Sequence, residues 1–384
     1  MFRSVSSTNI SMKMSEFEFV DQRRTYLEKK LNIRLGNIKK GLIDDIKDIH
    51  CENLIGAITL PLGVAGPLKL KGECVKGKFY IPLATSEGAL VASVNRGCKA
   101  ITMAGGAGVY AYKTGTTRGP VFFTGSLEKS KAFYIWLRKN ESKLAEIGES
   151  TSSYLRLIKI DAKTLANYAF VRFYFDTADA MGMNMATFAT DKIVNYIEEQ
   201  TKIRCLSIAG NYDTDKKPAW INFIDNRGIK VWAEIILSKK ILKDVLKTNA
   251  SEFFDVWLAK CMLGSAMSGS MGFNSHFANV IAAFFAATGQ DLAHTVEGSL
   301  GITTAKVLSG GDLYFSIHIP SLMLGTVGGG TNLKTKKEAL SIIGVKTSLE
   351  LAEVLAGAVL AGEISLLASL EEGLLAKAHK RLGR

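Results

Sequence analysis

Residues 351–370 read LAEVLAGAVLAGEISLLASL and form the most apolar long segment of the chain. By length alone such a segment can cross a bilayer as a helix. It nevertheless contains two acids, Glu353 and Glu363, and two glycines. Charged side chains are costly at membrane depth, so we expect a helix buried in a globular protein rather than a membrane span.

Upstream of this helix, residues 120–207 alternate between strand-like and helix-like stretches. GPVFFTG is followed by a charged helical stretch, then by SYLRLIKIDAKTL and YAFVRFYFD, and then by another helical stretch. Aromatic and β-branched runs bounded by turn residues are typical of strands. This pattern predicts a small α+β insert. Further helices are expected around 251–289 and 349–380.

The N-terminal residues have a different composition. VDQRRTYLEKKL and LIDDIKDI space their apolar residues three and four apart, which predicts a helical N-terminal region. The first residues lack the apolar stretch of a signal peptide. The 5 cysteines form no CxxC pair, which favours reduced thiols without a metal site. We therefore expect a cytoplasmic protein.

The chain has 384 residues and a formal net charge of +12, with 48 basic against 36 acidic residues. This length favours two domains and an appendage. Such a charge attracts polyanions, either nucleic acid or phosphate-bearing cofactors. The basic residues are scattered rather than gathered into an arm or stripe, which favours cofactors.

Four segments carry candidate chemistry, and the residues alone leave each of them open. NYDTDKKPAW places Asp215, Lys216 and Lys217 before a proline, either as a solvated turn or as a rigid loop whose lysines stabilise an oxyanion. In LATSEGALVASVNRGCKAI, Glu87 is either a general acid or a helix-start glutamate. Asn95 and Arg96 suit a phosphate or the surface.

In DAMGMNMATFATDKIVNYI the apolar stripe indicates a core helix, whose start at Asp179, Gly182 and Asn184 suits a phosphate. The glycine-rich loop GTVGGGT (325–331) allows close approach of a ligand to backbone, although a tight turn explains either loop equally well. His276 and Asn279 lie one helical turn apart, and Asp291 follows the glycine at the end of the same helix. The alternative for His276 is a core position. No GxGxxG after a strand, GxxxxGK[ST] or HExxH occurs.

Taken together, the segments resemble the 3-hydroxy-3-methylglutaryl-coenzyme A reductases, in their class I-like version. The resemblance runs from Glu52 to the C-terminus through ENLIGAITLPLGVAGPL, TSEGALVASVNRGCKA, GTTRGP, DAMGMNM, GNYDTDKKPAWINFIDNRG, GSAMSGS, NSHFANV, GQD, GTVGGGTN and VLAGEISL. It implies two hydride transfers from NADPH, with NADH possible and no metal, that convert the thioester to mevalonate and free coenzyme A.

The resemblance also implies residue roles. Lys216 stabilises the oxyanion, Glu87 donates a proton, Asp291 tunes both, and His379 protonates the leaving thiolate. The matched substrate-binding residues are Arg118, Asp215, Lys217, Lys260, His276 and Asn279, and the coenzyme A-binding residues are Ser93, Asn95 and Arg96. The matched cofactor-binding residues are Asp179, Met181, Gly182, Met183, Asn184, Gly328, Gly329, Gly330, Thr331 and Arg384.

The implied fold is α+β, with a large domain (53–119 and 208–384) around a long central helix. A small ferredoxin-like dinucleotide-binding domain (120–207) is inserted in it, and a helical region (1–52) precedes it. Family enzymes build the active site from two subunits, so we expect at least a homodimer, without membrane or nucleic-acid partners.

Two departures from the family pattern bear on binding. Ala209 replaces a common serine that contacts the substrate, and Ser153 replaces an arginine that animal enzymes place near the cofactor's 2′-phosphate. Two rival hypotheses remain: the same fold working in the oxidative direction with NAD, and a non-enzymatic RNA-binding protein. No stacking motif of interleaved aromatic and basic residues supports the latter.

Overall fold

The computed structural model describes residues 19–31 and 51–371. The chain divides into two compact units, residues 1–61 and 62–384. In the first unit, α1 (Val20–Leu31) forms from VDQRRTYLEKKL, which confirms the helix predicted there. The second predicted helix of this region, LIDDIKDI, lies outside the described residues.

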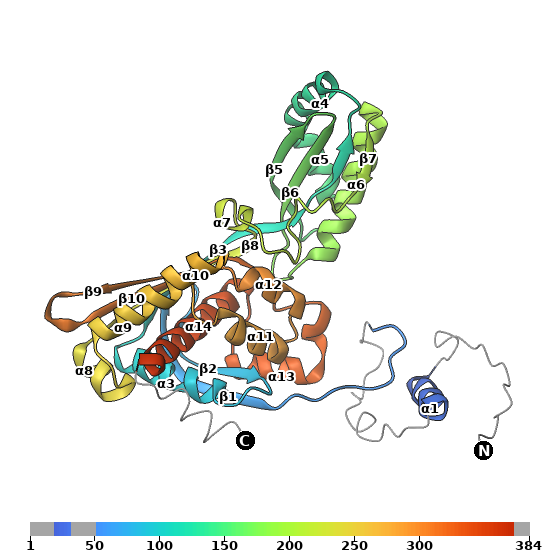
Figure 1. The fold of residues 1–384 in the computed structure, drawn as a ribbon. Coiled ribbons are helices and arrows are strands. Elements are labelled where there is room, and N and C mark those ends of the chain that lie inside the picture. Colours follow the sequence, from blue (N-terminus) through green and yellow to red (C-terminus); the bar gives the residue numbers. More distant parts are fainter. Residues whose placement is uncertain (1–18, 32–50, 372–384) are drawn as a thin grey trace, which may run out of the picture. The chain divides into compact units, whose positions relative to one another are not determined.

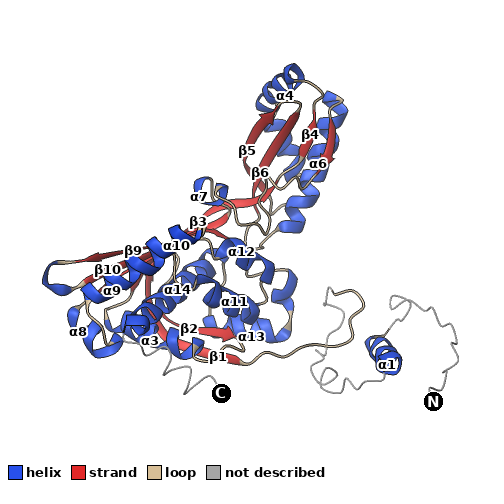
Figure 2. Ribbon diagram, viewed as in Figure 1, coloured by secondary structure: helices blue, strands red, loops and turns tan. Residues whose placement is uncertain are grey.

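The second unit is an α+β structure in which one long strand belongs to two sheets (Figure 2). The first sheet contains β1 (Leu62–Gly72), β2 (Lys76–Ala84), β3 (Ala107–Arg118), β8 (Gly228–Leu237), β9 (Ile302–Val307) and β10 (Leu313–Leu322). The second contains β4 (Val121–Phe123), β5 (Arg156–Leu165), β6 (Tyr168–Asp176) and β7 (Arg204–Ser207). The described strands follow the order β7-β4-β6-β3-β8-β10-β9; β1 pairs with β2 and β3, and β5 pairs with β6.

Strand β3 makes this connection because its two halves have different partners. Residues 108–115 pair antiparallel with β8 in the first sheet, and residues 116–118 pair antiparallel with β6 in the second. The side chains at the end of β3 therefore lie where the two sheets meet.

The helices of this unit are α3 (Leu90–Met103), α4 (Leu127–Lys139), α5 (Glu141–Glu149), α6 (Met183–Thr201), α7 (Ile221–Ile224), α8 (Lys239–Ile241), α9 (Ala250–Trp257), α10 (Ser265–Ser268), α11 (Phe277–Thr288), α12 (Thr295–Gly298), α13 (Lys334–Ile343) and α14 (Ser348–Glu371). Two π-helical segments, Leu242–Leu246 and Leu258–Gly264, flank α9. Short 3-10 turns occur at Leu292–His294, Ser309–Gly311 and Gly329–Asn332.

The strands and helices of residues 120–207 have their own core. It includes Phe122, Phe133, Phe173 and Phe175, which pack against α6 residues such as Ile193. Figure 1 shows β4–β7 and α4–α6 grouped together, apart from the helices around α14. The predicted α+β character of this segment agrees with these elements, while its dinucleotide-binding role stays a prediction.

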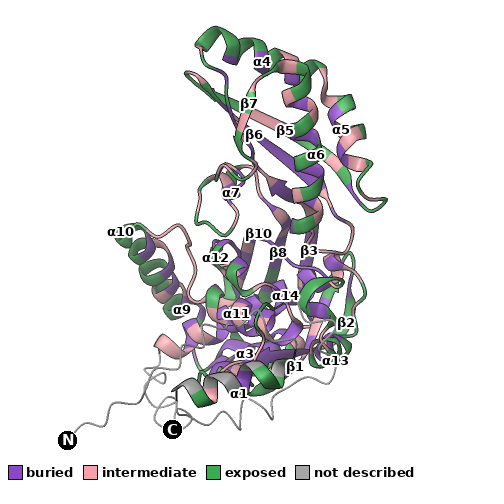
Figure 3. Ribbon diagram, turned by 90° about the vertical axis from the view of Figure 1, so that its right-hand side faces the viewer, coloured by how far each residue is buried: buried purple, intermediate pink, exposed green. Residues whose placement is uncertain are grey.

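Helix α14 is the centre of the larger core and confirms the prediction of a buried helix. The segment Ser348–Leu370 is long and apolar enough to cross a membrane, but 94% of its most apolar window is buried inside the protein. Figure 3 shows α14 and α11 largely in the colour of buried residues, whereas α10 is mostly exposed. Residues 372–380 of the predicted helix lie outside the described part of the chain.

The two acids inside α14 accept hydrogen bonds from backbone that would otherwise be unpaired. Glu353 accepts from the amide of Val75 at 2.9 Å, and Glu363 from the amides of Ser275 and His276 at 2.8 and 2.7 Å. Burial raises the pKa of Glu363 to about 7. A buried carboxylate is tolerated when it is hydrogen-bonded, so these acids tie neighbouring loops to the central helix.

Candidate active site

The loop of residues 210–218 carries the NYDTDKKP motif, and its backbone is held in an uncommon conformation. Thr214 and Lys216 have positive φ angles of 59° and 56°. Thr117 donates to the carbonyl of Asp213 at 2.8 Å, and Thr214 donates to Asn222 at 2.6 Å. Such left-handed conformations cost free energy outside glycine and persist only where surrounding contacts enforce them. Of the two interpretations of this segment, a solvated turn or a rigid loop, the structure shows the rigid loop.

Lys216 forms an ion pair with Asp291. The distance from Lys216 Nζ to Asp291 Oδ2 is 2.8 Å, and both side chains are partly exposed. Burial alone raises the pKa of Asp291, but hydrogen bonds from Lys216 and from the Ala293 amide outweigh it, so this pKa is lowered. The structure thus joins two of the four predicted catalytic residues, and Asp291 is held as the anion.

A charged network lies beside this pair, and its members Arg227, His294 and Glu297 are fully buried. Arg227 pairs with Glu297 and, at 2.9 Å, with Asp215, and its Nε donates to Thr117 at 2.8 Å. His294 Nδ1 lies 2.8 Å from Glu297 Oε1. Asp215, His294 and Glu297 are close enough to hold a metal ion, and the guanidinium of Arg227 already forms ion pairs with both carboxylates.

The predicted substrate cations are distributed around the loop. Arg118, at the end of β3, lies 3.3 Å from Asp213 and 3.7 Å from Asp215, and its guanidinium also donates to Thr187. Lys217 is exposed. Arg118 is therefore fixed in position, whereas Lys217 is available to an incoming anion.

A second group of predicted residues lies at the N-terminal end of α11. His276 is the N-cap residue, and burial lowers its pKa. Asn279, in the first turn, donates to Glu87 Oε1 at 3.3 Å. Glu87 is exposed in the single chain and lies just before the start of α3. The neighbours that follow it turn inward on α3, whereas Glu87 precedes that helix.

Lys260 and His276 line one cleft of about 710 Å³, together with Pro218 and several hydroxyl side chains. Lys260 is exposed and has no hydrogen-bond or ion-pair partner among the described residues. The cleft therefore offers an unpaired cation next to the end of the NYDTDKKP loop.

A separate cleft of about 440 Å³ brings the two glycine-containing loops together. Its lining includes Met181, Gly182, Met183, Asn184, Gly328, Gly329, Gly330, Thr331 and Asp291. No side chain caps the N-terminus of α6, whose first amides are left free for an anion. A Cβ on Gly289 would lie 2.4 Å from the carbonyl oxygen of Gly330. Glycines thus form much of the backbone surface of this cleft. Asp291 belongs both to this lining and to the ion pair with Lys216.

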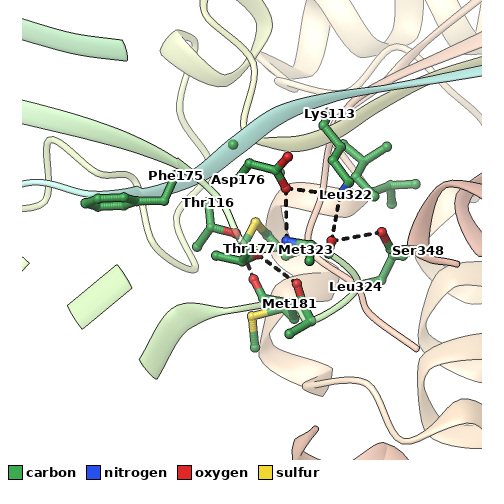
Figure 4. Close-up of a pocket in the computed structure, with 15 residues that line it drawn as sticks. Lys113, Thr116, Phe175, Asp176, Thr177, Met181, Leu322, Met323, Leu324 and Ser348 are labelled. Carbon is green, nitrogen blue, oxygen red and sulfur yellow. Dashed lines mark hydrogen bonds and ion pairs between the residues drawn. The ribbon is translucent and has the colours of Figure 1, made fainter. Parts of the chain in front are cut away.

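Two sets of hydrogen bonds anchor these loops. Gln290 exchanges two hydrogen bonds with the backbone of Gly325, at 2.9 and 3.0 Å. Behind the first loop, Lys113 contacts Asp176 and the carbonyl of Ala178 (Figure 4). Asp179 does not line the cleft: its carboxylate accepts from the amide of Ser348 at 2.8 Å, at the start of α14. Its position supports a structural role in holding the loop.

The predicted coenzyme A residues lie along α3. The side chains of Ser93 and Arg96 each donate a hydrogen bond to the hydroxyl oxygen of Ser365 in α14, both at 3.0 Å. Asn95 is exposed and accepts from the amide of Gly66 at 2.9 Å. The other two predicted site residues, His379 and Arg384, lie outside the described part of the chain.

Sequence reasoning missed Arg227, His294 and Glu297. One signal was present, because Asp291, His294 and Glu297 are spaced three apart in DLAHTVE and would share one face of a helical turn. Arg227 gave no such signal, since its partners come from segments far along the chain.

Comparison with known proteins identifies relatives of this chain. Residues 19–384 match the family model described as hydroxymethylglutaryl-coenzyme A reductase. The 3-hydroxy-3-methylglutaryl-coenzyme A reductases of Methanothermobacter thermautotrophicus and Methanocaldococcus jannaschii are 46% and 48% identical, covering 96% and 94% of this chain and 94% and 92% of their own. A class II reductase from Streptococcus pneumoniae, solved with NADPH, superimposes with a TM-score of 0.71 at 19% identity over 93% of this chain and 98% of its own, which indicates a shared fold.

Proposed function

Because the chain belongs to the hydroxymethylglutaryl-coenzyme A reductase family of oxidoreductases, we propose that it reduces (S)-3-hydroxy-3-methylglutaryl-coenzyme A to mevalonate and coenzyme A with two hydrides from NADPH. One observation carries the proposal. Asp291 both pairs with Lys216 at 2.8 Å and lines the glycine-rich cleft. A cation suited to an oxyanion therefore stands beside a surface suited to a dinucleotide.

The residues of the glycine-rich cleft fit a nicotinamide dinucleotide. The free amides at the start of α6 suit its diphosphate, and Gly328–Thr331 admit close backbone contact. When bound, the nicotinamide supplies the hydride. Arg384 lies outside the described residues, and the preference for NADPH over NADH is our expectation from the family resemblance alone.

In the proposed mechanism, Lys216 stabilises the negative charge that develops on the thioester oxygen and later on the aldehyde oxygen. Asp291 holds the lysine in place, as their contact supports. Glu87 gives a proton to the oxygen, and His379 gives one to the leaving thiolate. A preorganised donor lowers the barrier because it needs no reorganisation when charge develops.

The substrate's free carboxylate is assigned to the cations around the two clefts. Lys260 and Lys217 are exposed, and Arg118 is oriented by Asp213 and Thr187. Charge-assisted hydrogen bonds are the strongest contacts such a carboxylate can make. Ser93, Asn95 and Arg96 are proposed to contact coenzyme A, in agreement with their common position on α3.

We also propose a homodimer, a cytoplasmic location and a class I-like enzyme. Glu87 contacts Asn279 at the N-terminal end of α11, and Asp291 follows the C-terminal end of this helix, which has 12 residues and is hence roughly 18 Å long. No hydrogen bond or ion pair joins Glu87 to Lys216 among the described residues. A second subunit that supplies one of these groups would complete the site.

The proposal is tested by following nicotinamide oxidation with hydroxymethylglutaryl-coenzyme A, with NADPH and NADH in parallel. We expect turnover with NADPH and weaker turnover with NADH. A strong NADH preference, together with faster mevalonate oxidation by NAD, would favour the oxidative direction. Silence with both cofactors from folded dimer, with RNA retained at physiological salt, would replace the enzyme hypothesis with nucleic-acid binding.

The role of His379 is tested by its Gln variant. Reduction of free mevaldehyde releases no thiolate, so it needs no acid for that step. We expect His379→Gln to slow thioester reduction far more than mevaldehyde reduction. Equal slowing of the two reactions would remove His379 from this role.

A further inference from the structure

His294 occupies a central position in the site, and only its spacing from Asp291 and Glu297 marks it in the sequence. It ends the short 3-10 turn that begins after Asp291, and its side chain is fully buried. Its ring lies between the loop that carries Asp215 and the segment that carries Asp291. The charged groups that face it are Asp215, Asp291 and Glu297.

The contacts of the two ring nitrogens differ. Nδ1 lies 2.8 Å from Glu297 Oε1, and a carboxylate can only accept, so Nδ1 carries a proton. Nε2 lies 3.7 Å from Asp291 Oδ2 and 3.9 Å from Asp215 Oδ1. It has no hydrogen-bond partner among the described residues. A buried nitrogen left unpaired between two carboxylates calls for a function.

Glu297 itself is fixed, which makes the ring orientation definite. Arg227 pairs with Glu297 and, at 2.9 Å, with Asp215, and both Arg227 and Glu297 are fully buried. The imidazole therefore cannot rotate away without leaving its own buried Nδ1–H unpaired, which costs free energy.

We propose that His294 is a positioning residue of the reductase, whose Nε2 sets the placement of Asp291 toward Lys216 and of Asp215 toward the substrate. The inference rests on the proposed function and deepens it. When both ring nitrogens carry protons, Nδ1 donates to Glu297 and Nε2 faces the carboxylates of Asp215 and Asp291, so the ring links the substrate-binding Asp215 to the catalytic Asp291. The doubly protonated ring is small enough to fill this space and donates from its two nitrogens in opposite directions at once.

The main test compares His294→Leu with His294→Gln in steady-state kinetics of the full chain. We expect His294→Leu to lower kcat roughly 10- to 100-fold, the usual loss when a group that orients a functional side chain is removed. Gln carries its donors on a single nitrogen, so His294→Gln should recover part of the loss. The KM for NADPH should change less than about threefold in both, because binding of the dinucleotide does not need the ring.

His318→Gln is the matched control. His318 also has an unpaired Nε2, and it stacks on Trp232 with the ring centroids 4.9 Å apart, but it contacts no proposed catalytic residue. Its variant should keep kcat within about twofold. A double-mutant cycle of His294→Leu with Asp215→Asn should be non-additive in kcat/KM, because the two residues share one network.

A second measurement covers the case in which His294 variants fail to fold. In the wild-type protein with ¹⁵N-labelled histidine, the Nδ1 of His294 should be protonated, and its Nε2 signal should move when hydroxymethylglutaryl-coenzyme A is added, while the His318 signals stay unchanged. An unmoved signal, or a folded His294→Leu with unchanged kcat beside an active wild type, overturns this inference alone. An inactive wild type overturns the proposed function and this inference with it.

Discussion

At the C-terminal end of α11 the charged groups are paired within the chain, whereas at the N-terminal end Lys260 is unpaired among the described residues and Glu87 is weakly bound. Asp291 pairs with Lys216, and the buried network of Arg227 and Glu297 lies beside them. At the other end, Lys260 has no hydrogen-bond or ion-pair partner among the described residues, and the carboxylate of Glu87 accepts one hydrogen bond from them, at 3.3 Å. One end is assembled before the substrate arrives, and the other is completed by what binds.

The difference corresponds to two kinds of chemistry. A group that stabilises a transition state works best when it is already oriented, because reorganisation would add to the barrier. Groups that bind a substrate carboxylate must be free to receive it. We therefore expect substitutions at the C-terminal end to lower kcat and those at the N-terminal end to raise KM.

The largest expected effect is that of Lys216→Ala. Loss of the preorganised cation should raise the activation barrier by about 3 kcal/mol or more, which is a fall in kcat of at least about 100-fold. The measurement is NADPH oxidation with saturating substrate. Lys240→Ala, at an exposed position away from both clefts, is the control and should leave kcat unchanged. A Lys216→Ala variant with near-normal kcat would contradict the assignment of the C-terminal end of α11 to transition-state stabilisation.

Glu363 tests how the N-terminal end is tied to α14. Because burial raises the pKa of this carboxyl to about 7, the folded protein binds a proton that the unfolded chain has lost. Its contribution to stability is therefore present below the unfolded pKa, near 4.5, and is lost as pH rises through about 7. The amount is on the order of 3 kcal/mol.

The measurement is urea unfolding of the wild type and of Glu363→Gln at several pH values. The free energy of unfolding of the wild type should fall relative to that of the variant as pH rises toward neutrality. Glu353→Gln is a useful comparison, because burial also raises the pKa of Glu353, at a distant point of the same helix. Parallel pH profiles for the wild type and Glu363→Gln would show that this carboxyl titrates normally in the fold.

More of the backbone structure than of the charge network could be predicted from the sequence. The acids in the apolar run 351–370 were enough to predict a buried helix, because a paired carboxylate is acceptable in a protein core and costly in a membrane. The contact of Lys216 with Asp291 could be expected only by resemblance to a family, since the two residues are far apart in sequence. The exposure of Glu87 could not be predicted from its neighbours, because the turn before α3 decides where the side chain points.

A smaller effect is expected at the N-terminal end from Lys260→Ala. The side chain is exposed and unpaired, so its removal should leave the thermal midpoint of unfolding unchanged. Loss of a charge-assisted hydrogen bond worth roughly 1.5–3 kcal/mol should raise the KM for hydroxymethylglutaryl-coenzyme A about 10- to 100-fold. Lys243→Ala, another exposed lysine, is the control. If kcat falls while KM stays constant, the assignment of this end to binding is wrong.

The smallest effect concerns the glycine at the C-terminal cap of α11. Gly289 and Gly344 both end helices with left-handed φ angles, 74° and 80°. A Cβ on Gly289 would lie 2.4 Å from the Gly330 carbonyl oxygen, whereas a Cβ on Gly344 would meet nothing within 4 Å. Both alanine variants should lose about 1–2 kcal/mol of stability from the backbone conformation. Only Gly289→Ala should also raise the KM for NADPH, because it displaces the loop that lines the cleft. Equal KM values in the two variants would show that this loop does not take part in cofactor binding.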